Sequence, residues 1–445
     1  MSPEPTDTSD RRRESFQAPK GTHDVLPPAS ARWEHLVASF ADVVGRAGYG
    51  LVQQPMFEDV GVFLRMGEGT DVVTKELYDF DDRDKRRLSL RPEGTASVVR
   101  AYVQHRPQVV PWKVWYATPV FRHERPQAGR YRQHHQLGVE AIGSADPDLD
   151  VEAIALLGDW YAALGLRQVR LVVNSMGTPA DRAAYAARLT GFLRDRSADL
   201  AEADREKVEA HPLRVLDSKS PQTRAAIADA PEMLDTLDAA SRAHFDRVTA
   251  GLTALGLPFE VDARLVRGLD YYTHTLFEFR SDALDAAQDT IGGGGRYDGL
   301  VEALGGPPTP GVGFGSGIER VLLTCDAEGV FDATATPLDL FVVDVTGGSA
   351  ARDVTTEARR AGLRADRAFD GRSRKSQMKA ADRSGARLVA IVGEDEAAAG
   401  TVTLRDLRGD GGQRRVERAA LIDEIRDSRP AGAAGPRGDD GARDD

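Results

Sequence analysis

Apolar residues recur at helical spacing near the start of the chain and over a long central stretch. Residues 30–47 carry large apolar side chains three to four positions apart, with Ser30 at the expected N-cap: Trp33, Leu36, Val37, Phe40, Val43 and Val44. This spacing predicts a helix. The Ala-rich, weakly aromatic residues 179–256 predict a second helical region.

Between these helical regions the pattern favours strands. Runs rich in β-branched and aromatic residues occur at 51–59, 86–90, 113–121, 137–144, 167–177 and 258–281. Strands therefore predominate on both sides of a helical insert. The pattern predicts a large central sheet with antiparallel hairpins, interrupted by helices.

From residue 338 the rhythm changes to strands alternating with helices. A strand is expected at 338–345, helices at 349–361 and 373–384 with a strand between them, and further strands at 387–393 and 401–407. Such alternation predicts a small α/β domain. Pro337 and the Ala/Thr stretch 333–336 mark the expected linker. The polar, Pro- and Gly-rich residues 1–15 and 429–445 are predicted to be disordered tails.

Composition places the chain among soluble globular proteins. Of its 445 residues 41% are apolar and 29% charged, which is typical of that class. The single cysteine, Cys325, excludes a disulfide framework and a Cys-based zinc site. The arginines at 11–13 precede no apolar stretch, and no apolar run approaches the roughly 18 residues that span a bilayer. A cytoplasmic protein is expected.

The net charge of −12, from 58 Lys and Arg against 70 Asp and Glu, argues by itself against a polyanionic partner. A nucleic-acid site needs only one basic face, however. Residues 359–387 contain ten Arg and Lys less three Asp, a local charge of +7. That density favours a surface that contacts phosphates.

Glycines alternate with other residues from Gly311 to Gly317, directly before Ile318, Glu319 and Arg320. The chain has no GxxxxGK[ST] sequence, and this alternation does not match GxGxxG, so neither a P-loop nor a dinucleotide fingerprint is predicted. Alternating glycine suits a strand that a flat ligand or another backbone approaches closely. A tightly packed junction between a strand and a helix explains the run equally well.

A second motif is a strongly basic hairpin. Phe121–Arg125 and the returning Gln133–Gln136 flank a loop, and four arginines fall within eleven residues: Arg122, Arg125, Arg130 and Arg132. Guanidinium groups contact phosphate in a bidentate manner, although an exposed charged hairpin is the common alternative. His134 and His135 point to opposite faces of a strand, so no metal site is expected there.

Three more motifs complete the set: RPEGT at 91–95, LVRGLDYYT at 265–273 and GGGGRYDG at 292–299. The first is expected to close a strand, the second to form a strand, turn and strand, and the third to be a flexible glycine run. Each has a structural explanation when taken singly. Glu93 then caps a helix, and Tyr271 and Tyr272 pack in a core. All five motifs in one chain favour a shared function.

In this order the motifs resemble those of class II aminoacyl-tRNA synthetases, and specifically the histidyl-tRNA synthetase family. FRHER with QHHQLGVEAIG resembles the second class motif, and GVGFGSGIER resembles the third. The stretches that resemble the histidine family in particular are PKGTHDVLP, TDVVTKELYDF, LRPEGTASVVRA, LVRGLDYYT and GGGGRYDGL. The resemblance runs from about Pro19 to Ile425.

The resemblance implies an α+β fold. Residues 16–333 would form a catalytic domain on an antiparallel sheet of six or seven strands flanked by helices, with a helical insertion at about 180–257. An α/β anticodon-binding domain would follow at 337–427. A homodimer is also implied, with an interface that includes residues 48–60.

The reaction implied has two steps. The carboxylate of L-histidine attacks the α-phosphorus of ATP, which gives histidyl-adenylate and pyrophosphate, and the 3′-terminal ribose of tRNA(His) then takes the acyl group. By resemblance the catalytic residues are Arg122, Arg267 and Arg320, and ATP is bound by Arg122, Glu124 and Arg320. Mg²⁺ is expected on the outer phosphates of ATP, without a metal site of the protein itself.

Histidine would be bound by a set that the same motifs provide: Glu93, Gly94, Thr95, Gln136, Glu140, Arg267, Tyr271 and Tyr272. Glu93 and Gln136 are expected at the α-amino group, and Glu140 and Tyr272 at the imidazole. A pocket that forms hydrogen bonds with both imidazole nitrogens would be left with unpaired buried polar groups when another amino acid enters. Such a pocket can favour histidine over other amino acids by a factor of ~10⁴–10⁵. His134 stands where many relatives carry Phe.

The resemblance assigns tRNA contacts to Arg125, Gln127 and Arg130, and to the basic segment 359–387. Neither a membrane nor DNA is expected as a partner. Three other functions remain open from the motifs. They are a catalytically silent paralogue that serves as regulatory subunit of ATP phosphoribosyltransferase, an RNA-binding module without chemistry, and a synthetase of another specificity. The retained arginines and the LVRGLDYYT sequence argue against them.

Overall fold

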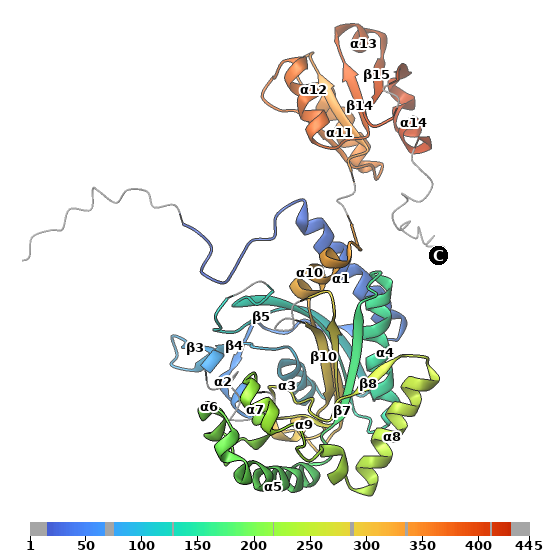
Figure 1. The fold of residues 1–445 in the computed structure, drawn as a ribbon. Coiled ribbons are helices and arrows are strands. Elements are labelled where there is room, and N and C mark those ends of the chain that lie inside the picture. The colour runs from blue at the N-terminus through green and yellow to red at the C-terminus, as the bar shows by residue number, and fades with distance from the viewer. Residues whose placement is uncertain are drawn as a thin grey trace, which may run out of the picture. The chain divides into compact units, whose positions relative to one another are not determined.

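The computed structural model describes residues 16–66, 75–126, 129–216, 218–284, 289–333, 337–409 and 412–428. The predicted tails at 1–15 and 429–445 lie outside the described residues. The chain divides into two compact units between residues 334 and 335 (Figure 1). No described helix is long and apolar enough to cross a membrane.

The first unit is built on an eight-stranded sheet. Its order is β1 (Gly50–Leu51), β5 (Trp112–Phe121), β6 (Gln133–Ile142), β11 (Gly311–Gly317), β10 (Thr290–Arg296), β9 (Thr273–Ser281), β7 (Val169–Ser175) and β8 (Phe259–Val261). The six inner strands are antiparallel, as the resemblance implies. The expected count of six or seven strands was wrong, because the short strands β1 and β8 add a parallel pairing at each edge.

The glycine run at 292–295 is not the flexible segment that the sequence suggested. It lies in β10, a central strand between β9 and β11. A Cβ on Gly294 would lie 2.0 Å from the carbonyl oxygen of Gly313, and one on Gly295 would lie 2.3 Å from that of Thr275. Glycine is therefore required by the close approach of neighbouring strands, and the pairing on both sides removes its freedom.

Helices cover both faces of this sheet. One face packs against α1 (Ala29–Arg46), α4 (Pro147–Ala163), α8 (Ala239–Ala254) and α10 (Ile318–Glu328), with Phe40, Trp160 and Phe277 in the shared core. The other face packs against α2 (Val60–Leu64), α3 (Thr95–His105) and α9 (Leu300–Ala303). Alternate residues of β7 and β9 supply the two cores, as the pleat requires. The N-terminal helix was predicted within a residue of α1, whereas α3 was not predicted.

A small sheet and an insertion complete the unit. The small sheet pairs β2 (Phe57–Asp59), β4 (Arg87–Leu90) and β3 (Tyr78–Asp81). Between β7 and β8 the chain forms α5 (Pro179–Asp195), α6 (Glu202–Arg205), α7 (Pro221–Ala226) and α8, with short 3₁₀ turns among them. The region is helical as predicted, but Pro212, Pro221 and Pro231 divide its middle into short turns. Tyr185 and Leu189 lie in a separate insertion core.

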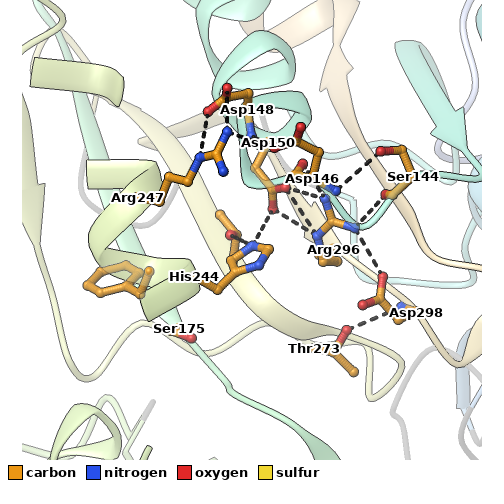
Figure 2. Close-up of polar contacts among 12 residues, drawn as sticks. Ser144, Asp146, Asp148, Asp150, Ser175, His244, Arg247, Thr273, Arg296 and Asp298 are labelled. Atoms are coloured by element: carbon orange, nitrogen blue, oxygen red, sulfur yellow. Dashed lines mark hydrogen bonds and ion pairs between the residues drawn. The ribbon is translucent and has the colours of Figure 1, made fainter. Parts of the chain in front are cut away.

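The final helix of the insertion, α8, is joined to the catalytic sheet by a buried ionic cluster (Figure 2). Arg296 of β10 and Asp150 of α4 are both 0% exposed, and the Nε of Arg296 lies 3.1 Å from Oδ2 of Asp150. The same guanidinium donates to the carbonyl oxygens of Ser144 and Asp146. His244 of α8 approaches Oδ1 of Asp150 at 3.5 Å. The arginine of the GRYD sequence therefore has a structural role.

The second unit is a five-stranded α/β sheet. Its order is β13 (Ala365–Arg367), β12 (Leu340–Asp344), β14 (Leu388–Val392), β15 (Thr401–Asp406) and β16 (Gln413–Glu417). The predicted alternation is confirmed by α11 (Ser349–Arg360) and α12 (Arg374–Arg383). Three short elements were not predicted: α13 (Glu394–Ala399), β16 and α14 (Leu421–Asp427).

Candidate active site

A cavity of about 790 Å³ opens above the central strands of the first unit. Its wall is strongly cationic: eight lining residues are basic, and four are acidic. The basic ones are Arg122, Arg130, Lys219, Arg224, Arg264, Arg267, Arg280 and Arg320, and the acidic ones are Glu124, Glu278, Asp289 and Glu319. A cavity with this excess of fixed cations is suited to a polyphosphate ligand.

The structure brings the three predicted catalytic arginines to this one cavity. Arg122 follows β5, and its Nε donates to the carbonyl oxygen of Pro92 at 2.9 Å. Arg320 lies in the first turn of α10 and donates to the carbonyl oxygens of Thr290 and Gly129 at 2.8 and 3.2 Å. Burial lowers the pKa of both guanidinium groups, because loss of hydration disfavours the charged form. A bound anion would stabilise these buried cations.

Arg267 reaches the cavity over the glycine-rich strand. Its Nη1 donates to Oε1 of Glu278 at 2.7 Å, and a Cβ on Gly293 would lie 2.6 Å from the same nitrogen. Only glycine at position 293 leaves room for the Arg267 guanidinium. Although burial acts to lower it, the pKa of Arg267 is raised by the neighbouring Tyr272 and Glu278.

The segment that carries Arg267 was predicted as a strand, and this was wrong. Residues 262–272 form an irregular connection between β8 and β9, and regular pairing begins at Thr273. Leu265, Tyr271 and Tyr272 are buried in the core beneath the sheet. These side chains are buried although the segment has no strand pairing. Their apolar and aromatic pattern therefore resembled that of a strand.

Glu140 lies on β6 at the centre of a buried hydroxyl cluster. Its carboxyl group accepts hydrogen bonds from Thr95 Oγ1 at 2.7 Å, from the Tyr116 hydroxyl at 3.2 Å and from the Tyr297 hydroxyl at 2.5 Å. Desolvation raises the pKa of Glu140 to about 8. A Cβ on Gly313 would lie 1.9 Å from Oε2 of Glu140, so the alternating glycines of β11 make room for this carboxyl group.

Tyr116 and Tyr297 were missed by the sequence reasoning. Tyr297 stood in the GRYDG sequence and was available as a candidate. Tyr116 lies in a strand with other aromatic residues, and nothing in its spacing separates it from the core. The tyrosine ring also explains Gly94, where a Cβ would lie 2.4 Å from a carbon of the Tyr116 ring.

Glu93 stabilises the start of α3, as its structural interpretation suggested, and it also lies close to Tyr271. Its carboxylate accepts from the backbone nitrogens of Thr95 at 2.9 Å and Ala96 at 2.7 Å, which caps α3. The Tyr271 hydroxyl approaches the same carboxylate at 3.4 Å. Desolvation raises the pKa of Glu93, and the hydrogen bonds from the helix oppose this shift.

The buried cluster adjoins the cationic cavity. Gln136 lines the cavity directly, whereas Glu93, Glu140 and Thr95 lie in the cluster beneath it. The rings of Tyr271 and Tyr272 are 4.7 Å apart, and the Arg267 guanidinium lies 6.0 Å from the Tyr272 ring. The cationic cavity therefore borders a buried polar cluster, and Gln136 and Arg267 lie in the wall of the cavity on that side.

The residues assigned to the tRNA acceptor end are less uniformly placed. Arg130 pairs with Glu124, and both line the cavity. Arg125 is exposed, and Gln127 lies outside the described residues. His134 also lines the cavity, and burial with Arg122 and Arg320 nearby lowers its pKa to about 3. Its imidazole is neutral at physiological pH.

In the second unit part of the basic segment is gathered at one place. Arg374, Lys375 and Lys379 of α12 line a cavity of about 640 Å³ together with Met378, Asp382 and Arg405. Other cations of the segment are used inside the unit, since Arg359 pairs with Asp366 and Arg387 donates to Ser428.

Comparison with known proteins gives consistent results over both units. A family model described as histidyl-tRNA synthetase matches residues 21–321, and one described as anticodon binding domain matches residues 340–428. The histidine–tRNA ligase of Geobacillus kaustophilus is 47% identical over 391 residues, 86% of this chain and 91% of that protein. That of Saccharopolyspora erythraea is 47% identical over 421 residues, 93% and 99% of the two chains.

A solved structure extends this likeness to the fold. The apo histidyl-tRNA synthetase of S. aureus superposes with a TM-score of 0.77 at 33% identity, covering 92% of this chain and 100% of that one. The family model, the curated relatives and the fold agree over most of the chain, and the site motifs lie within the matched residues. The chain belongs to the histidyl-tRNA synthetase family.

Proposed function

We propose that the protein activates L-histidine with ATP and transfers the histidyl group to the 3′ end of tRNA(His). The observation that carries this proposal is a cationic cavity beside a buried polar cluster. A cavity with Arg122, Arg267 and Arg320 in its wall adjoins a buried cluster in which three hydroxyl groups surround Glu140.

In the first step an oxygen of the histidine carboxylate bonds to the α-phosphorus, and the bond from that phosphorus to the bridging oxygen of pyrophosphate breaks. Negative charge grows on the phosphate oxygens, so fixed cations stabilise the transition state most. Arg122 is assigned to the α-phosphate, Arg267 to the α-phosphate and the attacking carboxylate, and Arg320 to the adenine and outer phosphates. Glu124 is assigned to the nucleotide as well.

Selection of histidine is assigned to the buried cluster. Glu140 and Tyr272 are assigned to the imidazole, Glu93 and Gln136 to the α-amino group, and Gly94, Thr95 and Tyr271 to the walls. The hydroxyl groups around Glu140 hold its carboxyl group in one orientation. An apolar side chain in this place would leave the carboxyl group without a partner from the ligand, at a cost of about 1–3 kcal/mol for each unsatisfied group.

Mg²⁺ enters this scheme with the nucleotide. No group of three or more His, Cys, Asp or Glu side chains arranged to hold a metal occurs among the described residues. Mg²⁺ commonly binds through phosphate oxygens, water and one or two carboxylates, and Glu319 and Asp289 line the cavity. The ion would neutralise charge on the outer phosphates.

The tRNA is assigned to surfaces of both units. Arg125, Gln127 and Arg130 are assigned to the acceptor end, and Arg130 lines the cavity. The cations of α12 are assigned to the anticodon region, since the family model of this unit is described as an anticodon binding domain.

We also propose a cytoplasmic homodimer. Leu51, Met56 and Phe57 are each more than half exposed, and Phe80 is 44% exposed. Phe57 and Phe80 are in ring contact at 6.5 Å. Exposed apolar residues of this kind, on β1, on β2 and β3 of the small sheet and between them, are typical of a protein interface.

ATP–pyrophosphate exchange with each of the twenty amino acids separately tests the activation step. Exchange with histidine alone is expected, and an Arg267→His variant is expected to lose it while remaining folded. Absence of exchange from a folded, ATP-binding preparation would favour the regulatory-subunit alternative. Exchange with a different amino acid would overturn the assignment of Glu140 and Tyr272.

A further inference from the structure

The connection 262–272 carries three of the residues assigned to catalysis and histidine binding, yet it belongs to no helix or strand. It joins β8 to β9. Reacting groups must be held to within about 0.5 Å of their productive position, and loops rarely achieve this without support from rigid elements. Other parts of the molecule must therefore fix this connection.

One support comes from α5, the first helix of the insertion. Arg182 lies in the first turn of α5, and its Nη2 donates to Oδ1 of Asp270 at 3.0 Å. Its Nη1 donates to the backbone carbonyl oxygen of Asp270 at 2.7 Å. One guanidinium group thus holds both the side chain and the main chain of the residue that precedes Tyr271.

Two further contacts tie the same connection to the insertion. Val266 packs against the insertion core that contains Tyr185 and Leu189. Arg264 donates to the backbone carbonyl oxygen of Ala228. Arg264, Val266 and Asp270 therefore contact the insertion, and Arg264 and Val266 line the cavity together with Arg267.

We infer that Arg182 is a positioning residue for histidine activation, which acts through Asp270 on Arg267 and the two tyrosines. This inference rests on the proposed function. Neither Arg182 nor Asp270 lines the cavity, so neither is placed to touch a substrate there. The helical insertion thereby becomes part of the activation machinery, in addition to any contact that it makes with tRNA.

Because the ion pair between Arg182 and Asp270 is partly exposed, its effect on the position of the connection can be separated from its effect on global stability. The side chains of Arg182 and Asp270 are 29% and 34% exposed. Ion pairs with such access to water contribute little to global stability. Loss of Arg182 should therefore loosen the connection without unfolding the unit.

The test measures histidine-dependent ATP–pyrophosphate exchange by Arg182→Ala in the full-length protein. We expect kcat to fall by about 10-fold or more while KM for ATP changes by less than about 3-fold, because misplaced reacting groups weaken the transition state more than nucleotide binding. Arg182→Lys, which keeps the charge and a donor, should recover part of the rate. Arg194→Ala is the matched control: it lies on the same helix, and its exposed ion pair is with Glu209 and not with a residue of the connection.

Hydrogen exchange supplies a readout that does not depend on activity. Amides of residues 264–273 should exchange faster in Arg182→Ala, while those of α5 keep their wild-type protection. Wild-type kcat in this variant would overturn the inference, and so would equal loss of protection in α5, which would show a merely structural contact. Absence of exchange activity in the wild type would instead contradict the proposed function, and the protection of residues 264–273 would still report on Arg182.

Discussion

Glu140 has a charge state that depends on its surroundings in the fold. Its carboxyl group is 0% exposed, and within the described residues its hydrogen-bond donors are hydroxyl groups. Desolvation raises its pKa to about 8, so the ligand-free protein holds a mostly protonated Glu140 at pH 7. A neutral carboxyl group can donate as well as accept, which suits an imidazole that offers one donor and one acceptor.

The raised pKa has a consequence for stability. The folded state holds this proton more tightly than the unfolded state does, so the stabilisation is complete below about pH 4.5 and declines as the pH rises to about 8. Glu140→Gln keeps the shape and cannot ionise. Relative to wild type, its free energy of unfolding should therefore improve by up to ~1.4 kcal/mol per pH unit within that window. Urea denaturation at pH 5, 6, 7 and 8 measures this difference, and a difference independent of pH would contradict the shift.

The buried ion pair between Arg296 and Asp150 also affects stability at the scale of single residues. Because both groups are 0% exposed, removal of one leaves an uncompensated buried charge. Arg296→Met should lower the free energy of unfolding by about 3–5 kcal/mol, and the double variant with Asp150→Leu should recover part of that loss. Guanidinium denaturation measures both. Arg86→Ala, which breaks an exposed pair with Asp82, serves as control and should cost less than about 1 kcal/mol.

At the scale of elements, one carboxylate joins the first and last helices of the insertion. Asp181 accepts from the Thr178 backbone nitrogen and hydroxyl in the capping box of α5, both at 2.8 Å. It also accepts from Asp238 N at 2.9 Å and Ser241 Oγ at 2.7 Å, at the start of α8. Although burial acts to raise it, these hydrogen bonds lower the pKa of Asp181 to about 2. The Asp181 carboxylate therefore links the N-termini of the two helices, whose N-cap residues are Thr178 and Asp238.

We expect Asp181→Ala to destabilise the insertion by roughly 2–4 kcal/mol, since several donors lose their acceptor at once. Urea denaturation at pH 7 should show the loss, and hydrogen exchange should locate it in α5 and α8. Wild-type protection of both helices would show that the hydrogen bonds of Asp181 are dispensable. Thr190→Ala is a mild control, because this half-buried residue of α5 donates only to the carbonyl oxygen of Ala186 in its own helix.

At the scale of the whole molecule, the two units divide the work. Every residue that lines the cationic cavity belongs to the first unit. A truncation after residue 333 should therefore leave histidine-dependent exchange unchanged, while KM for tRNA rises by at least about 10-fold through loss of the phosphate contacts. Aminoacylation kinetics measure the second effect. Unchanged tRNA charging would exclude the second unit from tRNA recognition.

The proposed dimer gives the second prediction at this scale. Phe57→Glu places a charge among the exposed apolar residues Leu51, Met56 and Phe80. Sedimentation should show the mass fall from twice 48.2 kDa to 48.2 kDa, because a buried unpaired charge is costly at an interface. A wild-type protein that sediments at 48.2 kDa would contradict the dimer.

Several features were predictable from the sequence because they depend on local spacing. The period of apolar residues indicated α1, the alternating glycines indicated β11, and the strand–helix rhythm after residue 338 indicated the second unit. The glycine strand β10 and the connection 262–272 were misassigned. A glycine run has the same composition in a loop and in a close-packed strand, and buried aromatic residues resemble a strand whether or not a ladder forms.

The sequence by itself determined the family, the antiparallel architecture and three arginines of the cavity, Arg122, Arg267 and Arg320, because motifs at set spacing carry these. Only the tertiary structure decided which groups meet. It placed Tyr116 and Tyr297 on Glu140, and Arg182 on Asp270. The members of these pairs are 24 to 157 residues apart in the sequence. Their meeting depends on the packing of whole elements, which local spacing does not encode.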